Sequence, residues 1–351
     1  MICTITALPV RCGDCIFVNF TDVNNKEHSI LIDTGYADTF NRTIKLIIDD
    51  LQSKDNNLDL LVLTHTDGDH IGGVKRLLKE YGLSSFKEVW FNYSPIPYSV
   101  GNDSNDISIK QGIWLRDLLL SSGIVNEGPI MATQVHTISE AILTVISPDN
   151  EQFDCFIEEW SKEEKSINTP NEGSVGTLET DYDVPIIELA KKNFEKDSSL
   201  SNRSSIAFIL NIGTFKALFT GDSHPDVLKN SLHSLGYSPT NPISLNLVKI
   251  SQHGSKGNTN DDIMDIIDCQ HFLISTNSAN KHKFPHKEAL SRIVISCHNR
   301  HPNSFIHFYF TYQSTAFDVI FTDDEYKLFN IICHFPEIDT GGITLTFSTN
   351  E

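Results

Sequence analysis

Residues 60–73 read Leu60-Leu-Val-Leu-Thr-His65-Thr-Asp67-Gly-Asp69-His70-Ile-Gly-Gly73. The apolar run at the start of this stretch predicts a buried strand. Four possible metal ligands then follow within six residues: His65, Asp67, Asp69 and His70. Core packing gives no reason for such a cluster. Two imidazoles and two carboxylates at a strand end are instead typical of a metal site that supports chemistry.

Strand and helix patterns alternate on both sides of this stretch. Apolar runs predict strands at 2–8, 15–20, 29–33, 59–64, 88–93, 141–147, 205–212, 215–220, 245–251 and 271–275. Helical spacing predicts helices at 43–51, 74–81, 111–120, 261–267 and 287–297. The tail is expected to be nearly all β, with strands at 305–310, 317–321, 326–332 and 343–347. These elements indicate an α/β protein with two sheets and helices on the outside.

The chain is expected to divide unevenly. We predict a main domain at 1–301, with an acidic and partly flexible insertion at about 94–200, and a β-rich C-terminal extension at 302–351 packed on the same domain. Turn-forming residues fill 166–176. Between 149 and 197 lie 14 acidic residues and 5 lysines. A solvated insertion explains this charge most simply, and a surface that docks a protein partner is the alternative.

Composition limits the class of protein. A hydrophobic content of 39% in 351 residues supports a large core, and no run of about 18 apolar residues predicts a membrane span. The start of the chain has no signal-peptide pattern, so we expect a soluble cytoplasmic protein. Seven scattered cysteines, Cys12 and Cys15 among them, form no disulfide framework. The net charge of -19 argues against a protein that coats nucleic acid, although an enzyme can bind phosphates through metal ions.

Two further strand ends carry single acidic residues. Asp33 follows Ile30-Leu-Ile and precedes Gly35, where an ordinary helix N-cap is the simplest role. Asp222 ends Ala217-Leu-Phe-Thr-Gly-Asp222, and one carboxylate in this position can bridge two cations about 3.5–4 Å apart. His224 lies close by and is expected to be an exposed loop residue.

Polar residues gather in two more segments. His253 follows the strand at 245–251 and could complete the shell of a second metal. Ser255 and Lys256 come directly after it and could hold a phosphate. Asn202, or a serine beside it, could supply a weak oxygen ligand, although an ordinary turn explains that segment equally well.

Taken in order, these segments resemble the metallo-β-lactamase-fold hydrolases. Within that superfamily they are most similar to the C-terminal hydrolase domain of ComEC DNA-uptake proteins and its soluble stand-alone relatives. Those proteins carry a His-x-Asp-x-Asp-His-x-Gly-Gly motif, a Thr-Gly-Asp strand end and a His-Gly-Ser segment, which match 65–73, 220–222 and 253–255. Residues 274–286 look like their Ser-x-Gly-x-Asn…His-Pro-His segment. The resemblance covers about 2–93 and 199–297.

Three departures from the superfamily pattern change the expected metal. Asp67 replaces the usual second histidine, as it does in the ComEC-like branch, and Ser201 or Asn202 stands near the place of the third-motif histidine. The usual His-Pro-His is Phe284-Pro-His286, and the usual His-His-Gly is Gln252-His-Gly. More oxygen and fewer imidazole ligands favour manganese, with zinc as the alternative.

The resemblance implies a fold, a cofactor and a set of roles. The fold is an αββα four-layer sandwich, with two facing mixed sheets flanked by helices, and the cofactor is a pair of divalent metal ions. The implied ligands are His65, Asp67 and Asp222 for one ion and Asp69, His70, Asp222 and His253 for the other, with Asn202 as a further candidate. Asp33 would orient a ligand histidine, whereas phosphate contacts would come from Ser255, Lys256 and Lys281. Catalytic roles would fall to Asp69, Asp222, Lys256 and His286, the last as a leaving-group acid unless it is an exposed or structural histidine.

The expected activity is that of a phosphodiesterase or nuclease that acts on a nucleic acid or nucleotide and not on a membrane. Two other hypotheses remain open. The chain could be a regulatory or interaction subunit of a multi-protein system, such as one for antiviral defence, with a weak or silent metal site. It could also hydrolyse a small ester or lactam.

Overall fold

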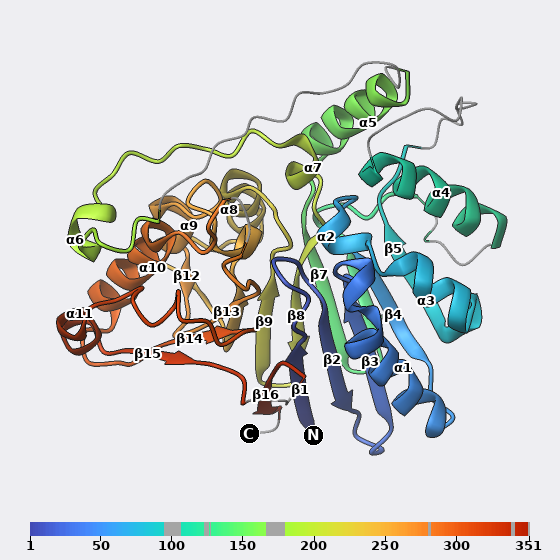
Figure 1. Cartoon of the computed structure of the whole chain (residues 1–351), viewed down its shortest axis with the longest axis horizontal. Helices are drawn as coiled ribbons and strands as arrows, with labels where there is room; N and C mark the ends of the chain where they lie inside the picture. Colours follow the sequence, from blue (N-terminus) through green and yellow to red (C-terminus); the bar gives the residue numbers. More distant parts are fainter. Residues whose placement is uncertain are drawn as a thin grey trace.

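The computed structural model describes residues 1–94, 107–122, 126, 128–165, 180–279, 282–337 and 341–349. The polar stretch at 166–176 therefore lies outside the described residues. The described part forms four layers, with two sheets face to face and helices on both outer sides (Figure 1). The predicted αββα arrangement is confirmed. Within the described ranges, no helix has the length and apolar character needed to cross a bilayer.

The first sheet has six strands, and most of them come from the first third of the chain. Its order is β16 (Ile343–Ser348), β1 (Ile2–Ala7), β2 (Ile16–Thr21), β3 (Glu27–Ile32), β4 (Leu58–Leu63) and β5 (Phe86–Phe91). The pairs from β16 to β3 are antiparallel, and β3, β4 and β5 are parallel. Every residue of β4 is buried, as expected for a central parallel strand with cover on both faces.

The second sheet has eight strands and is mixed in the same way. Its order is β15 (Ile331–His334), β14 (Ile306–Phe310), β13 (His271–Ile274), β11 (Leu247–Lys249), β9 (Phe215–Phe219), β8 (Ala207–Ile212), β7 (Ala141–Ser147) and β6 (Val135–Ile138). Antiparallel pairing joins β6 through β9, and parallel pairing joins β9 through β15. A separate parallel pair consists of β10 (Ile243–Ser244) and β12 (Ile267–Asp268).

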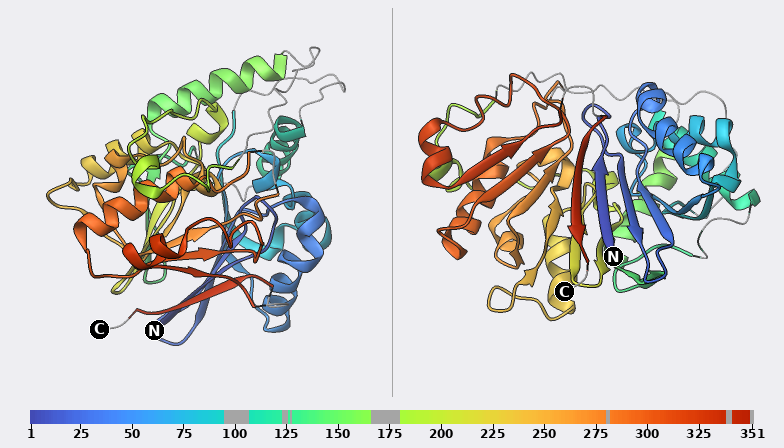
Figure 2. Two further views of the ribbon diagram at one scale, coloured as in Figure 1. Left: turned by 60° about the vertical axis from the view of Figure 1, so that its left-hand side comes forward. Right: turned by 90° about the horizontal axis from the view of Figure 1, so that it is seen from below.

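Segments far apart in the sequence share these sheets. β6 and β7 come from the segment 94–200, so part of that segment builds the second sheet. The tail contributes to both sheets, because β14 and β15 extend the second and β16 pairs with β1 in the first. Seen from below, β16 lies beside β1, and Ile2 pairs with Ser348 (Figure 2).

Helices cover both outer faces (Figures 1 and 2). The helices over the first sheet are α1 (Ile44–Ser53), α3 (Val74–Tyr81), α4 (Ile107–Ser122) and α5 (Asn150–Lys165), and their apolar residues form one core cluster with that sheet. The helices over the second sheet are α6 (Ile186–Leu189), α8 (Pro225–Ser234), α9 (Asp261–Met264), α10 (Lys287–Arg300) and α11 (Asp323–Leu328). Between the sheets lies a third core cluster, built by inward side chains of both. Short helical turns complete the described part: α2 (Gly68–Ile71), α7 (Leu200–Arg203), and the 3₁₀ turns at Ala37–Arg42, Leu83–Ser85 and Ser251–Gly254.

The predicted tail strand at 317–321 is wrong, and only residues 331–332 of the strand predicted at 326–332 belong to a strand. Residues 315–319 form turns, and helix α11 precedes the short strand β15. Thr322 and Glu325 form a capping box, in which each side chain bonds the other residue's backbone N–H, and this starts α11. Phe317, Ile320 and Phe321 still bury their side chains, but their spacing does not match the two-residue period of a strand.

The N-terminal end of α10 is held by a residue far away in sequence. The carboxylate of Asp181 accepts hydrogen bonds from the backbone N–H groups of Lys287 and Glu288, both at 2.8 Å. Tyr182 donates from its hydroxyl to the carbonyl of Pro285 at 3.0 Å. The segment that runs into α6 is thereby fixed to the start of α10, where it satisfies backbone donors that a helix cannot pair internally.

Asp181→Ala is expected to lower the free energy of unfolding by about 1–2 kcal/mol, the effect of losing a carboxylate cap. Chemical denaturation followed by circular dichroism measures this loss. Asp183→Ala serves as the matched control, because Asp183 is exposed two residues away and carries the same charge. Equal losses in the two variants would show that the contact with α10 contributes nothing.

Candidate metal centre

The predicted ligands lie in turns at the carboxyl ends of neighbouring parallel strands. His65, Asp67, Asp69 and His70 follow β4, while Asp222 follows β9 and His253 lies in the turn after β11. In each sheet the parallel strands end at one edge, so these turns meet at the junction of the two sheets. The fold therefore brings together residues that are up to 188 positions apart in the sequence.

Asp222 lies at the centre of this cluster. Its Oδ2 atom is 3.9 Å from Nε2 of His65, 3.4 Å from Nε2 of His70 and 3.7 Å from Nε2 of His253. One carboxylate oxygen thus faces three imidazole nitrogens, with the ring centroids of His65 and His70 only 4.1 Å apart. This is the position that a bridging ligand between two cations would occupy.

The other two carboxylates divide the cluster into two halves. Asp67 Oδ2 is 3.5 Å from Nε2 of His65. Asp69 Oδ2 is 3.3 Å from Nε2 of His253 and 3.8 Å from Nε2 of His70. The two halves share Asp222, and Nε2 of His70 lies between them, 3.4 Å from Asp222 and 3.8 Å from Asp69.

The chemistry of these atoms fits bound cations. Nε2 of His65, Nε2 of His70, Nε2 of His253 and Oδ1 of Asp222 are all buried without a hydrogen-bond partner among the described residues. Leaving such atoms unpaired costs about 1–3 kcal/mol each, and more for charged groups. Two of the side-chain groups with geometry suited to a metal ion are His65, His70 and Asp222, and Asp69, His70 and His253. A divalent ion in each half would pair these atoms.

Asp33 orients the ring of His70. It directly follows the last residue of β3, Ile32, and has a left-handed backbone conformation with a φ of 59°. Asp33 Oδ2 is 2.7 Å from Nδ1 of His70. The same carboxylate accepts hydrogen bonds from the Thr64 hydroxyl at 2.7 Å and the Thr64 backbone N–H at 2.8 Å. With Nδ1 donating to Asp33, the lone pair of Nε2 on His70 points to Asp69 and Asp222, as a metal ligand requires.

Asp33→Asn is expected to weaken metal binding by about 10–100-fold, the usual cost of losing a partner behind a ligand histidine. Calorimetric titration with Mn²⁺ measures the affinity. Asp59→Asn is the matched control, since Asp59 is also buried and lies 3.4 Å from a histidine, His28, at the opposite end of β4. Unchanged affinity in a folded Asp33→Asn protein would contradict the orienting role.

Charges within the centre reinforce one another when no cation is bound. Burial lowers the pKa of His70, but Asp222, Asp33 and Asp69 raise it by more, so that it stands well above its ordinary value. His253 behaves likewise: burial lowers its pKa, and neighbours that include Cys12 and Asp222 raise it by more. Burial raises the pKa of Asp222, whereas His70, His253 and Lys249 bring it well below the usual range. Without metal, protons on these histidines therefore balance the carboxylates.

The predicted candidate Asn202 contacts a different carboxylate. Its side-chain amide donates to Asp197 at 2.7 Å, while its Oδ1 atom is buried without a hydrogen-bond partner among the described residues. The neighbouring Ser201 donates to Asp67 Oδ1 at 2.7 Å. His224, expected to be exposed, is fully buried and lies 3.3 Å from Asp197. The segment before β8 therefore holds Asp67 through Ser201, and Asn202 belongs to the network around Asp197.

Two of the predicted phosphate-binding residues, Ser255 and Lys256, lie beside His253 and differ in how far they are buried. Ser255 is buried, and its Oγ accepts from the Gly257 N–H at 3.3 Å. Lys256 is half-buried, and its backbone N–H donates to Nδ1 of His286 at 3.0 Å. Nε2 of His286 faces the His282 carbonyl at 3.1 Å. His286 thus uses both ring nitrogens within the protein, which favours a structural role over proton donation. Lys281 lies outside the described residues.

Sequence reasoning missed two buried residues in the centre, Asp14 and Lys249. Asp14 lies between β1 and β2, and Lys249 is the last residue of β11. Their side chains form an ion pair beside Asp222. One signal was present, because Gly13-Asp14 repeats the Gly-Asp turn of Gly221-Asp222 after an apolar strand.

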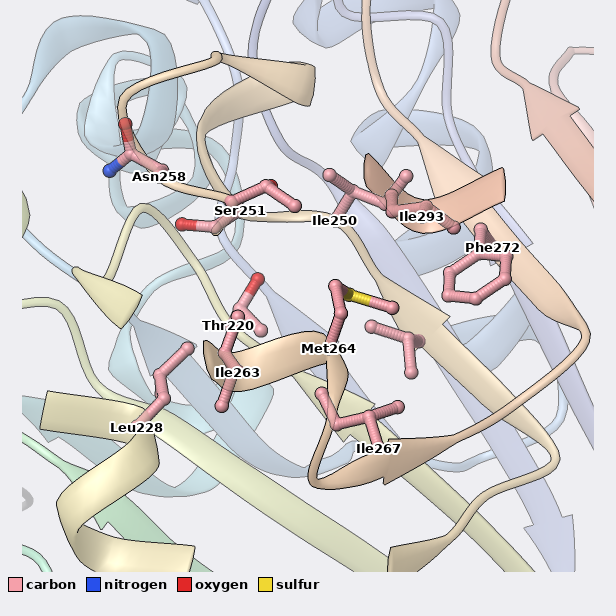
Figure 3. Close-up of a pocket in the computed structure, with 12 residues that line it drawn as sticks. Thr220, Leu228, Ile250, Ser251, Asn258, Ile263, Met264, Ile267, Phe272 and Ile293 are labelled. Atoms are coloured by element: carbon pink, nitrogen blue, oxygen red, sulfur yellow. The ribbon is translucent and has the colours of Figure 1, made fainter. Parts of the chain in front are cut away.

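Beside Thr220, a small cavity of about 30 Å³ lies between the second sheet and its helices (Figure 3). Apolar side chains such as Ile263, Met264 and Phe272 line it. Two of its polar groups are already engaged, since the Thr220 hydroxyl donates to the Lys249 carbonyl and the Ser251 hydroxyl donates to the Ser223 carbonyl. A space of this size could hold about one water molecule, so it does not serve as a substrate pocket.

Comparison with known proteins agrees with this architecture. The sequence model of the metallo-beta-lactamase superfamily matches residues 13–145. Among curated proteins, none matches the chain. Similar solved structures include YhfI, a metallo-beta-lactamase fold protein from Bacillus subtilis, at 11% identity over 99% of this chain and 100% of that chain, with a TM-score of 0.45.

Two other solved structures illustrate the range of similar proteins. A diphosphatase from the PhnP family has 12% identity over 99% of this chain and 98% of that chain, with a TM-score of 0.40. The long form of RNase Z from yeast has 11% identity over 71% of this chain and 32% of that chain, with a TM-score of 0.36. At these identities and scores, the solved structures carry no information on activity. The family match and the four-layer architecture confirm the predicted resemblance to metallo-β-lactamase-fold hydrolases and support a metal-dependent hydrolase. The narrower likeness to ComEC stays a prediction.

Proposed function

Because this chain has the metallo-β-lactamase fold with a His/Asp centre at the edge of its two sheets, we propose that it is a metal-dependent phosphodiesterase or nuclease. The observation that carries the proposal is the composition of that centre. Three carboxylates, Asp67, Asp69 and Asp222, each lie within 4 Å of an imidazole Nε2. An oxygen-rich set of this kind suits manganese or magnesium better than an all-histidine set does, so Mn²⁺ is favoured and Zn²⁺ is the alternative.

The proposed ligand sets follow the two halves of the cluster. His65, Asp67 and Asp222 would hold one ion, and Asp69, His70, His253 and Asp222 would hold the other. Bound together, two such ions supply a deprotonated water and a Lewis acid for the phosphoryl group.

The protein's own residues have three tasks in this proposal. Asp33 fixes His70 so that its Nε2 lone pair faces the centre, and Ser201 fixes Asp67. Ser255 and Lys256, next to His253, would bind the phosphate and offset its charge. His286, with both ring nitrogens engaged, would hold the Lys256 backbone in place.

We further propose a nucleic acid or nucleotide as substrate, with a protein partner at the acidic segment 149–197. A net charge of -19 disfavours broad electrostatic contact with nucleic acid. Recognition would therefore concentrate at the centre itself, where cations and Lys256 supply the positive charge.

The test is incubation of purified protein with Mn²⁺ and with single-stranded DNA, double-stranded DNA, RNA and cyclic dinucleotides. A chromogenic phosphodiester, a chromogenic ester and a lactam complete the substrate panel. We expect cleavage of at least one phosphodiester, with loss of that activity in the Asp69→Ala, Asp222→Ala double variant. The control is Asp50→Ala with Asp262→Ala, which removes two exposed carboxylates from α1 and α9 and should retain full activity.

Each contrary result points to a different conclusion. Cleavage of only the ester or lactam would replace phosphodiester chemistry with small-molecule hydrolysis. Two bound metal ions without any cleavage would favour the regulatory-subunit hypothesis. Phosphodiester cleavage that survives in the double variant would show that the reaction takes place elsewhere.

A further inference from the structure

Asp14 and Lys249 form a buried ion pair next to the metal centre, and the side chains are almost completely inaccessible, at 2% and 1% exposure. The Lys249 ammonium also donates to the Gly221 carbonyl at 2.9 Å. It lies 3.7 Å from Oδ1 of Asp222. Lys249 therefore links the turn between β1 and β2 to the turn that carries the bridging candidate.

The other oxygen of Asp14 faces a ligand histidine. Asp14 Oδ1 is 3.5 Å from Nδ1 of His253. Both atoms are buried, and neither has a hydrogen-bond partner among the described residues. On the far side of the same ring, Nε2 faces Asp69 and Asp222. A proton on Nδ1 that points to Asp14 would pair both atoms and leave the Nε2 lone pair directed at the centre.

We propose that Asp14 and Lys249 are a positioning pair for the metal centre: Asp14 selects the Nδ1–H form of His253, and Lys249 holds both Asp14 and Asp222 in place. The inference rests on the proposed metal centre, but not on which substrate it cleaves. It gives His253 a carboxylate partner, as Asp33 is the partner of His70. The two carboxylates come from different turns, after β1 and after β3, so two ligand histidines of the same proposed ion are each held by a separate turn.

Charge balance gives Lys249 a second reason to be buried. The centre contains five carboxylates and one lysine, Lys249, which leaves four negative charges. Two divalent cations would neutralise these four charges. The five carboxylates are Asp14, Asp33, Asp67, Asp69 and Asp222. Asp14 forms its ion pair with Lys249, whose ammonium also lies 3.7 Å from Asp222. A buried carboxylate of this kind is stable only beside a partner charge.

The experiment compares Asp14→Asn, Lys249→Met and Lys249→Arg in the full-length protein. Asparagine keeps the size of Asp14 but can offer its N–H₂ group to Nδ1, which favours the wrong form of His253. We expect Asp14→Asn to bind one equivalent of Mn²⁺ normally and the second about 10–100-fold more weakly. Lys249→Met should show the same loss, while Lys249→Arg, which keeps the positive charge, should recover part of it.

Cobalt substitution supplies a second readout. Ligand-field absorption of bound Co²⁺ depends on the number and type of ligands. If His253 no longer coordinates the metal in Asp14→Asn, the spectrum of that variant at saturating Co²⁺ should differ from that of the wild type. Lys287→Met is the matched control. Lys287 is also 1% exposed and is paired with a carboxylate, Glu325, at 2.9 Å, outside the centre. It should lose stability but keep the wild-type affinity and spectrum.

The outcomes separate this inference from the proposed function. Wild-type affinity and spectrum in a folded Asp14→Asn protein would overturn the positioning role. If the single variants fail to fold, the Asp14→Asn, Lys249→Met double variant leaves no unpaired charge and is measured instead, with the same criterion. A wild-type protein that binds no divalent metal would refute the proposed function itself. Metal binding without phosphodiester cleavage would refute only the activity and leave the positioning pair intact.

Discussion

Asp222→Asn is expected to lower kcat for phosphodiester cleavage by about 10³-fold or more, because catalytic groups that act as a unit fail together. A single oxygen of Asp222 faces the Nε2 atoms of three histidines, between 3.4 and 3.9 Å away. Asparagine fills the same volume but removes the negative charge that two cations would share. Steady-state kinetics with Mn²⁺ measures the loss, and elemental analysis of the purified variant should show fewer than two metal ions per chain.

Asp59→Asn again provides the comparison, because it makes the same chemical change in a buried carboxylate outside the centre. Its activity per folded molecule should equal that of the wild type. An Asp222→Asn enzyme with wild-type kcat would show that no bridging carboxylate is needed, and the two-ion arrangement would have to be abandoned.

Removal of metal is expected to destabilise the protein more strongly as the pH rises. In the absence of a cation, the pKa values of His70 and His253 stand well above the ordinary 6.5. When the pKa of a histidine is higher in the folded protein than in the unfolded chain, its proton stabilises the folded state. This stabilisation is fully present below the pKa of the unfolded chain, about 6.5. That stability is lost as the pH climbs through the folded-state value. A bound cation replaces the protons and keeps the carboxylates paired at high pH.

Thermal unfolding with Mn²⁺ or with a chelator, at intervals between pH 6 and 9, measures this effect. The gap between the two melting temperatures should widen with pH, and a metal concentration 1,000 times Kd adds about 4 kcal/mol of stability. Calorimetry in two buffers with different ionisation enthalpies should detect protons released on metal binding. A gap that stays constant or narrows with pH would contradict the histidine protonation described above.

Most of the first sheet could be predicted from the sequence. Strands β1 to β5 lie within two residues of their expected ends, because each is a short apolar run between turn-forming residues. The tail was harder to predict. In α11, the capping box of Thr322 and Glu325 sets the local structure, and the apolar residues that suggested strands on either side of it join the core from turns and a short helix.

The ligands of the centre could also be predicted from local sequence, because each one follows an apolar strand. Charged and imidazole side chains in these positions do not contribute to a hydrophobic core. The two supporting residues that were missed, Asp14 and Lys249, give a weaker signal. Lys249 ends a strand, where a lysine ordinarily reaches solvent, and only the packing of β11 between β9 and β13 buries it. Asp14 resembles any turn aspartate until the fold brings it to His253. Pair contacts between distant turns decide these roles, and a single sequence does not encode them locally.

The pairing of β16 with β1 has a consequence for synthesis on the ribosome. β1 leaves the ribosome about 340 residues before its partner at 343–348. At about 5–20 residues per second, this edge of the nascent sheet waits roughly 20–70 s for its neighbour. Unpaired edge strands are templates for intermolecular association. β16 thus protects a strand that is made long before it, and slow translation would prolong the period in which a chaperone is needed.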